Sequence, residues 1–227
     1  KRAPRLCGAI MDRMPAAAPE GRGAVLPMPL VTEHLTCVRG GQEVFRDVNF
    51  VIPERGCLAV TGRNGAGKSS LLRVLAGLIQ PARGSARLVG GDSDLALAEQ
   101  AHFLGHLDPV KPTLTVAENL DFWRRFLGGG AGRTTAEALG AVGLAPLADL
   151  PAGYLSAGQR RRLSFARLLV VRRAVWLLDE PTAALDTAAQ ELATGLMRAH
   201  VADGGILVAA THAPVGLDGA SLAMGAA

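Results

Sequence analysis

The chain has 227 residues, with 24 lysines and arginines against 20 aspartates and glutamates, and 49% of its residues are hydrophobic. This length and composition suit one sizeable hydrophobic core with a small subdomain. No uninterrupted apolar stretch approaches the roughly 18 to 20 residues of a membrane helix, so the sequence predicts no membrane span. Residues 1–27 hold five basic residues against two acidic ones, which places +3 of the net charge of +4 there. The rest of the chain is nearly neutral, and we expect no nucleic-acid partner.

The first 27 residues differ from the rest. They are rich in proline, alanine, glycine and arginine, and they lack both a hydrophobic period and the apolar core of a secretory signal. We expect this segment to be disordered or a non-native extension, and we expect one folded domain over residues 28–227. The three cysteines form no C-x-x-C pair, which predicts reduced, small hydrophobic residues.

A phosphate-binding loop follows the first predicted strands. Strands are expected at 30–38, 44–52 and 57–61, and a helix is expected at 69–78. The segment between the last strand and this helix reads Gly-Arg-Asn-Gly-Ala-Gly-Lys-Ser, in which glycines let successive N–H groups point at phosphate oxygens. The flanking strand and helix favour this interpretation over a glycine-rich turn with an exposed lysine. The predicted phosphate contacts are Gly62, Arg63, Asn64, Gly65, Ala66, Gly67, Lys68, Ser69 and Ser70.

Strands and helices alternate along the remaining chain. A strand is expected near 86–89, a mostly helical subdomain over about 106–158, a helix at 158–171, a strand at 174–179, a helix at 184–201 and a strand at 205–210. Alternation of this kind, with a phosphate loop at a strand end, predicts an α/β fold with a mainly parallel sheet in a three-layer sandwich.

Two carboxylates end the apolar run at 174–179. An apolar strand that closes on Asp179 and Glu180 is by itself often only a buried strand that meets a polar loop. With a phosphate loop upstream, Asp179 can hold Mg²⁺ together with the Ser69 hydroxyl. Glu180 can then orient or deprotonate the attacking water. The sequence therefore predicts binding and hydrolysis of a nucleoside triphosphate with Mg²⁺.

Three short motifs in order carry a family resemblance. The segment Leu155-Ser-Ala-Gly-Gln159 resembles the LSGGQ signature of ATP-binding-cassette ATPases, with alanine in place of one glycine. Ala184-Leu-Asp186 looks like the family's D-loop, and His212, after a strand, looks like its switch histidine. The resemblance implies a P-loop NTPase sandwich with a helical subdomain. It also implies a head-to-tail homodimer in which Ser156 and the Gly158 N–H contact the partner's ATP.

The resemblance also assigns roles to the remaining residues. It implies a catalytic set of Lys68, Glu180 and His212, and a trans contact formed by Leu155, Ser156, Ala157, Gly158 and Gln159. Residues 37–45 and 103–123 further resemble the ATPase subunits of cytochrome c maturation haem exporters. That likeness implies an integral-membrane permease partner and a location at the cytoplasmic face of the bacterial inner membrane. The alternatives are another ABC transporter, a soluble cassette, or a nucleotide sensor that does not hydrolyse.

The chain departs from the general cassette pattern at two positions. Arg39 stands where most cassettes place an aromatic residue to stack on adenine, and a guanidinium plane can stack there instead. The slot of the usual γ-phosphate-sensing glutamine falls on His106 or Leu107, and the nearest glutamine is Gln100. His106 is equally well explained as an ordinary loop histidine.

One aromatic cluster has two interpretations. Phe122, Trp123 and Phe126 share a predicted helix. They form either core packing of the helical subdomain or a groove for a cytoplasmic helix of the membrane subunit.

Overall fold

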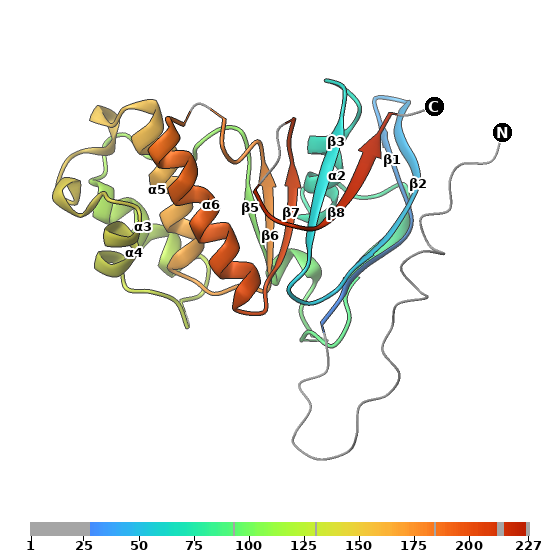
Figure 1. The fold of residues 1–227 in the computed structure, drawn as a ribbon, viewed down its shortest axis with the longest axis horizontal. Helices are drawn as coiled ribbons and strands as arrows, with labels where there is room; N and C mark the ends of the chain where they lie inside the picture. The colour runs from blue at the N-terminus through green and yellow to red at the C-terminus, as the bar shows by residue number, and fades with distance from the viewer. Residues whose placement is uncertain (1–27, 93, 130, 184, 213–215, 226–227) are drawn as a thin grey trace, which may run out of the picture.

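The computed structural model describes residues 28–227 except 93, 130, 184, 213–215 and 226–227 (Figure 1). The predicted N-terminal extension, residues 1–27, lies outside the described residues. None of the described helices combines the length and apolar character that crossing a bilayer requires.

A five-stranded parallel sheet forms the centre of the molecule (Figure 1). Its strands are β5 (Ala101–Leu104), β6 (Val175–Asp179), β7 (Ile206–Ala210), β3 (Cys57–Gly62) and β8 (Ala220–Met224), in that spatial order. Each neighbouring pair is parallel. The predicted parallel α/β sheet is therefore confirmed, although β5 and β8 were not predicted as strands.

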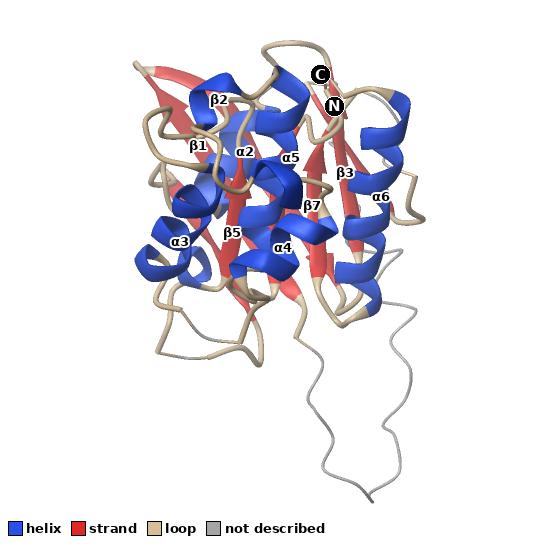
Figure 2. Cartoon of the chain, turned by 90° about the vertical axis from the view of Figure 1, so that its left-hand side faces the viewer, coloured by secondary structure: helices blue, strands red, loops and turns tan. Residues whose placement is uncertain are grey.

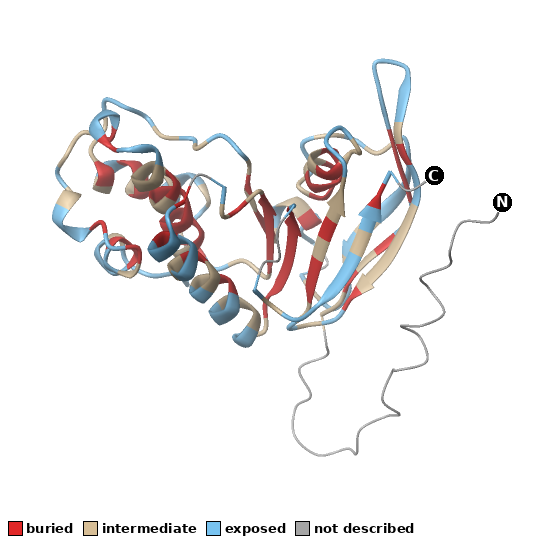
Figure 3. Ribbon diagram, turned by 45° about the horizontal axis from the view of Figure 1, so that its top comes forward, coloured by how far each residue is buried: buried red, intermediate tan, exposed pale blue. Residues whose placement is uncertain are grey.

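Both faces of this sheet are covered. Every residue of β6 and β7 is buried, and Figure 3 shows these strands as the buried middle of the molecule. Along β6, Val175 and Leu177 belong to one hydrophobic cluster, whereas Trp176 and Leu178 belong to the other. Side chains alternate across a strand, so the sheet is the middle layer of a sandwich with a core on each side.

One outer layer is an antiparallel sheet with a helix beneath it. Its strands are β1 (Leu30–Arg39), β2 (Gln42–Ile52) and β4 (Arg83–Leu88), and α2 (Lys68–Leu75) packs between this sheet and the parallel one. A layer of strands here differs from the helices that a simple α/β alternation would place on this face. The tip of the β1–β2 hairpin is Gly40–Gly41, with φ of 54° and 78°, the left-handed values that a two-residue hairpin turn needs.

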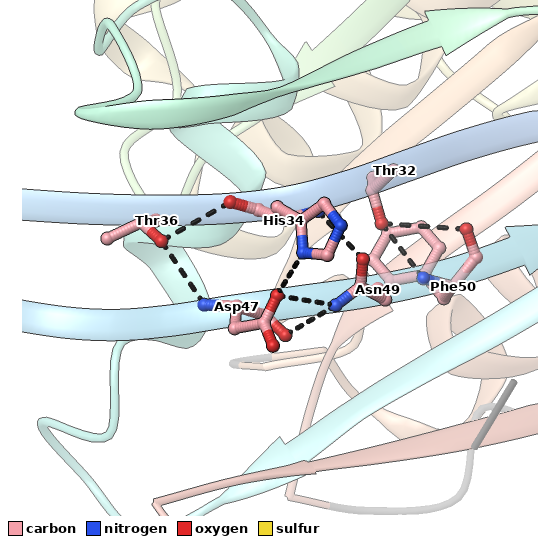
Figure 4. Close-up of polar contacts among 6 residues, drawn as sticks. All are labelled: Thr32, His34, Thr36, Asp47, Asn49 and Phe50. Carbon is pink, nitrogen blue, oxygen red and sulfur yellow. Dashed lines mark hydrogen bonds and ion pairs between the residues drawn. The ribbon is translucent and has the colours of Figure 1, made fainter. Parts of the chain in front are cut away.

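The β1–β2 ladder is interrupted where two non-glycine residues adopt left-handed backbone angles. His34 has φ of 50° and Asp47 has φ of 52°, and the register shifts between Thr32 and Leu35. Side chains replace the lost ladder bonds, as Figure 4 shows: the His34 N–H donates to Asn49 Oδ1 at 2.7 Å, and the Asp47 N–H donates to Thr36 Oγ1 at 3.2 Å. Irregularities of this kind increase the local twist of a strand pair.

The other outer layer is helical (Figure 2). It contains α3 (Val116–Phe126), α4 (Thr135–Ala141), α5 (Ala157–Leu169) and α6 (Thr187–Ala202). Three of these helices begin with a reciprocal capping box, in which the N-cap hydroxyl and the third helical residue satisfy each other's backbone N–H groups. The helix expected at 184–201 begins later than predicted, because the Asp186 carboxylate caps its first turn by accepting from the Ala189 N–H at 2.8 Å.

Two histidines pack into the interior: His102 is 3% exposed, and His200 is partly buried. His200 stacks on Trp176 with 4.1 Å between ring centroids, and burial lowers its pKa to about 4. His102 lies against the Val171 carbonyl at 2.7 Å, and burial lowers its pKa to about 3. Both rings are therefore neutral at pH 7 and act as packing groups rather than as acids or bases.

Candidate nucleotide-binding site

A cavity of about 740 Å³ lies at the carboxyl edge of the parallel sheet. Neighbouring strands β5, β6, β7 and β3 all end at this edge, so the segments that follow them meet there although they are distant in sequence. The cavity is within the size range of small-molecule sites. Its lining consists of Arg39, Gly40, Gln42, Glu43, Val44, Asn64, Gly65, Gly67, Lys68, Ser69, Ser70, His106, Asp179, Glu180 and His212.

The loop between β3 and α2 leaves the start of α2 open to an anion. The N-cap of α2 is Gly67, with φ of 98°, and no side chain caps this helix. Its first N–H groups therefore remain available, and a helix N-terminus carries partial positive charge. Gly62 permits the close approach of β8, because a Cβ there would lie 2.4 Å from the Met224 carbonyl oxygen. An open helix N-terminus of this kind can accept a phosphate group.

Lys68 is folded back over this loop. Its ammonium donates to the Gly62 carbonyl at 2.8 Å and to the Arg63 carbonyl at 3.2 Å, and the side chain is only 7% exposed. The third ammonium partner is His212 Nε2, at 3.1 Å. A lysine held in this way presents a fixed positive charge to the cavity instead of sampling solvent.

Asp179, at the end of β6, offers one free carboxylate oxygen. Its Oδ1 accepts from the Ser69 hydroxyl at 3.0 Å. The residue is 3% exposed, and its Oδ2 has no hydrogen-bond partner among the described residues. A buried carboxylate oxygen without a partner is costly unless something binds it. Carboxylate and hydroxyl oxygens side by side are ligands of the type that Mg²⁺ takes.

Glu180 follows Asp179 in an unusual backbone conformation. Its φ is 48°, and its N–H donates to the Ala210 carbonyl at 2.9 Å across to β7. Its Oε1 lies 3.6 Å from His212 Nε2, beyond the length of an ordinary hydrogen bond. Since the same imidazole nitrogen is closer to the Lys68 ammonium, it accepts from lysine in this arrangement. His212 thus bonds the cation of the cavity and lies beside its carboxylate without an ion pair, since a ring nitrogen that accepts from lysine carries no proton.

The opposite walls come from the β1–β2 hairpin and from the segment after β5. Arg39 lines the cavity together with Gln42, Glu43 and Val44, which the sequence did not single out. Of the two candidates for the glutamine slot, His106 lines the cavity, whereas Leu107 is 74% exposed to solvent. Gln100 lies elsewhere, where its side-chain amide binds the Asp92 and Leu95 carbonyls.

Several predicted site residues lie away from this cavity. Leu155, Ser156, Ala157, Gly158 and Gln159 do not line it, and neither does Asp186. Ser156 is exposed and caps α5 by accepting from the Gln159 N–H at 3.2 Å. Gly62, Arg63 and Ala66 also do not line the cavity, although the carbonyls of Gly62 and Arg63 hold Lys68.

The aromatic cluster on α3 packs against its own subdomain. Trp123 Nε1 donates to the Pro109 carbonyl at 3.4 Å, and the Arg167 guanidinium lies 4.6 Å from the Trp123 ring. Phe122 stacks on Phe126 with 5.8 Å between centroids, and Phe126 remains 69% exposed. These contacts favour the core-packing interpretation for Trp123.

Comparison with known proteins places this site in a family. A family model described as ABC transporter matches residues 45–183. The cytochrome c biogenesis ATP-binding export protein CcmA of Nitrobacter winogradskyi is 57% identical over 200 residues, which cover 88% of this chain and 100% of that protein. The protein of the same name from Bradyrhizobium diazoefficiens is 56% identical over 199 residues, covering 87% of this chain and 98% of that protein.

Solved structures agree on the fold. A dimeric ATP-binding cassette in a post-hydrolysis state with ADP and phosphate matches with a TM-score of 0.68 and 25% identity, covering 81% of this chain and 88% of the other. An ATP-binding subunit of an ABC transporter matches with a TM-score of 0.70 and 23% identity, covering 81% and 79%. The chain belongs to the ABC transporter ATPases, within the family of the cytochrome c biogenesis ATP-binding export proteins.

Proposed function

We propose that this chain is the ATP-hydrolysing subunit of a membrane exporter that serves cytochrome c biogenesis. The observation that supports the chemistry most directly is the meeting of Lys68, Asp179, Glu180 and His212 at one cavity. The match to an export protein of that pathway over 88% of this chain supports the biological role. The resemblance to haem-exporter ATPases points to haem as the exported group. On this proposal the chain works at the cytoplasmic face of the bacterial inner membrane.

ATP binds with its phosphates at the start of α2. The free N–H groups of that helix and the Lys68 ammonium meet the negative oxygens. Ser69 and Asp179 would hold Mg²⁺, and the bound ion would neutralise part of the phosphate charge; the unpartnered Asp179 Oδ2 fits this role. Arg39, on the hairpin wall, stacks its guanidinium plane on the adenine.

Hydrolysis depends on the carboxylate next to the metal ligand. Glu180 accepts the proton of the attacking water or orients that water toward the γ-phosphate. His212 accepts from the Lys68 ammonium and lies beside Glu180, so it fixes the lysine next to that carboxylate. In this proposal the loop between β3 and α2 binds the phosphates of ATP, and the residues that follow β6 and β7 carry out hydrolysis.

The active form is a head-to-tail dimer. Ser156 and Ala157 are exposed at the start of α5 and do not line the cavity of their own subunit. Together with the Gly158 N–H, they form a second helix N-terminus that can meet the γ-phosphate of the partner's ATP. Asp186, as the D-loop residue, lies at this same interface in the proposal. The dimeric cassette among the structural matches supports this arrangement.

The loop after β5 joins the nucleotide to a membrane permease partner. His106 faces the cavity while the next residue, Leu107, presents an apolar side chain to solvent. One short loop therefore carries both a group that can sense the γ-phosphate and a group that can enter an apolar interface. Coupling through His106 in place of the usual glutamine is part of the proposal.

Glu180→Gln is expected to keep ATP binding and to slow hydrolysis by about 100-fold or more, because the amide cannot take the proton of water. Lys68→Ala is expected instead to weaken ATP binding by about 1.5 to 3 kcal/mol, the range of hydrogen bonds to charged groups. ATP titration and steady-state hydrolysis of both variants separate the two roles. Wild-type turnover in Glu180→Gln would remove this carboxylate from the mechanism, and normal binding by Lys68→Ala would contradict the phosphate loop.

Arg39→Ala is expected to lower ATP affinity by about 0.5 to 2 kcal/mol, the range of a cation–π contact, whereas Arg39→Trp should preserve it. Equilibrium titration of the three proteins with ATP measures the difference. The cationic residue Arg87, which pairs with Glu33 and does not line the cavity, supplies the control variant Arg87→Ala. Equal affinities for wild type and Arg39→Ala would place the base elsewhere.

Leu107→Glu is expected to abolish binding to partner-containing membranes while the isolated chain hydrolyses ATP as before. A carboxylate carried into an apolar interface costs several kcal/mol of desolvation. The measurement is co-sedimentation with membranes that contain the permease, paired with the ATPase rate of the free chain. Leu78→Glu, at another exposed apolar side chain, is the matched control. Unchanged co-sedimentation of Leu107→Glu would exclude this loop from the interface.

A further inference from the structure

Arg161, in the second turn of α5, is the most fully bonded buried charge near the cavity. It is 4% exposed, although arginine is among the residues that are seldom buried. Its five N–H donors reach five acceptors. Nε donates to the Pro181 carbonyl at 3.3 Å, Nη2 to the carbonyls of Asp179 at 3.0 Å and Glu180 at 2.8 Å, and Nη1 to the Gly105 carbonyl at 2.7 Å and Asp108 Oδ1 at 3.3 Å.

Three of these acceptors belong to the strained turn after β6. Glu180 has φ of 48°, which is costly for a residue with a Cβ, and such a conformation persists only where the surroundings enforce it. The Ala210 carbonyl holds the Glu180 N–H from one side. Arg161 holds the Glu180 carbonyl and the carbonyls on either side of it. Together these bonds fix the direction in which the Glu180 carboxylate leaves the backbone.

The other two acceptors lie in the segment after β5, the strand that pairs with β6. Gly105 and Asp108 flank the segment that carries His106. The Arg161–Asp108 ion pair is largely shielded, with side-chain exposures of 5% and 18%. One guanidinium therefore joins the wall that carries the proposed water-activating carboxylate to the wall that carries the proposed sensor. Arg161 belongs to α5, whose N-terminus is formed by the exposed residues Ser156 and Ala157.

We infer that Arg161 is a positioning residue for ATP hydrolysis: it sets the spacing between the Glu180 turn and the His106 loop and ties both to the start of α5. This inference rests on the proposed function and adds to it a residue that touches neither nucleotide nor water. Arg161 is absent from the cavity lining and makes no bond to the phosphate loop. Its loss should therefore disturb turnover more than ATP binding.

If Arg161 had a purely structural role, its replacement would change stability and not turnover. Burying a charge costs free energy that an apolar side chain of similar size would not, so a buried arginine is weak evidence for a stabilising role. Its planar fork, in contrast, matches several carbonyls at fixed angles, which the point charge of lysine cannot do. Arg161→Lys keeps the charge and most of the volume while it removes this fork, and it therefore tests geometry rather than charge.

The neighbouring Arg162 supplies a matched control. It lies on the same helix, but its Nη1 donates to the Val142 carbonyl at 3.1 Å, in the helical layer and away from the cavity. Arg161→Lys and Arg162→Lys therefore make the same chemical change one residue apart. The full chain of each variant is assayed for ATP hydrolysis over a range of MgATP concentrations, and rates are expressed per folded molecule from a parallel unfolding curve.

For Arg161→Lys we expect kcat to fall at least about tenfold, the size of effect that a small misplacement of a reacting group produces. KM should change less than about threefold, which marks a loss after binding. Arg162→Lys should leave both constants within about twofold of wild type. Equal kcat for the two variants, or lower stability of Arg161→Lys with unchanged kcat per folded molecule, would overturn the inference.

A second variant keeps the inference testable if Arg161→Lys does not fold. Asp108→Asn leaves the carbonyls of the turn after β6 in place and weakens the bond from Arg161 to the His106 loop. We expect it to lower kcat, by less than Arg161→Lys would, with KM unchanged, and an unaltered kcat would contradict the link to that loop. Failure of the wild-type chain to hydrolyse ATP would contradict the proposed function instead, so the two ideas fail separately.

Discussion

Everything at the nucleotide site depends on the parallel alignment of β3, β7 and β6. Parallel strands send their carboxyl ends to one edge of the sheet, so the segments that follow them meet in space. The registers pair Asp179 with Ala210 and Val60 with Ala210, which brings the loop after β3 and the carboxylates after β6 to the same level. An antiparallel neighbour at any of these positions would have sent its functional residues to the opposite edge.

This edge of the sheet combines a fixed positive charge with two carboxylates, one for binding Mg²⁺ and one for hydrolysis. The start of α2 and the Lys68 ammonium supply the positive side. Asp179 is buried with one oxygen bonded and one free, and Glu180 is held in a backbone conformation that its residue type does not favour. Bonds from β7 and from α5 maintain that conformation, and preorganisation of this kind is what a hydrolytic site needs. The packing of α5 is therefore part of the chemistry as well as of the fold.

The elements with local signals were predictable from the sequence. The strand and helix on either side of the glycine-rich loop, the buried run that ends at Asp179, and the helix expected at 158–171 each rest on neighbouring residues, and each appears in the structure close to the expected bounds. β5 and β8 were missed because they are short and contain few β-branched residues, so only pairing with a neighbouring strand defines them. The antiparallel outer layer likewise depends on pairing between strands that are distant in the sequence, since β4 pairs with β1.

The finer parts of the site depend on contacts that no local pattern encodes. Whether His106 or Leu107 faces the cavity is decided by the path of a loop between β5 and α3. The sequence shows Arg161 only as the middle of three consecutive arginines. Its partners lie 18 to 56 residues away in the chain, so their identity follows from the tertiary fold alone.

The central claim is that this edge of the sheet is a Mg²⁺-ATP site, and the Mg²⁺ dependence of ATP binding tests it most directly. ATP is titrated into the wild-type chain, into Asp179→Asn and into the remote control Asp203→Asn, each with and without Mg²⁺. The structure predicts that Mg²⁺ strengthens ATP binding to the wild type and to the control, and that Asp179→Asn loses this gain because the free Oδ2 is replaced. The same gain from Mg²⁺ in Asp179→Asn as in the wild type would contradict the account.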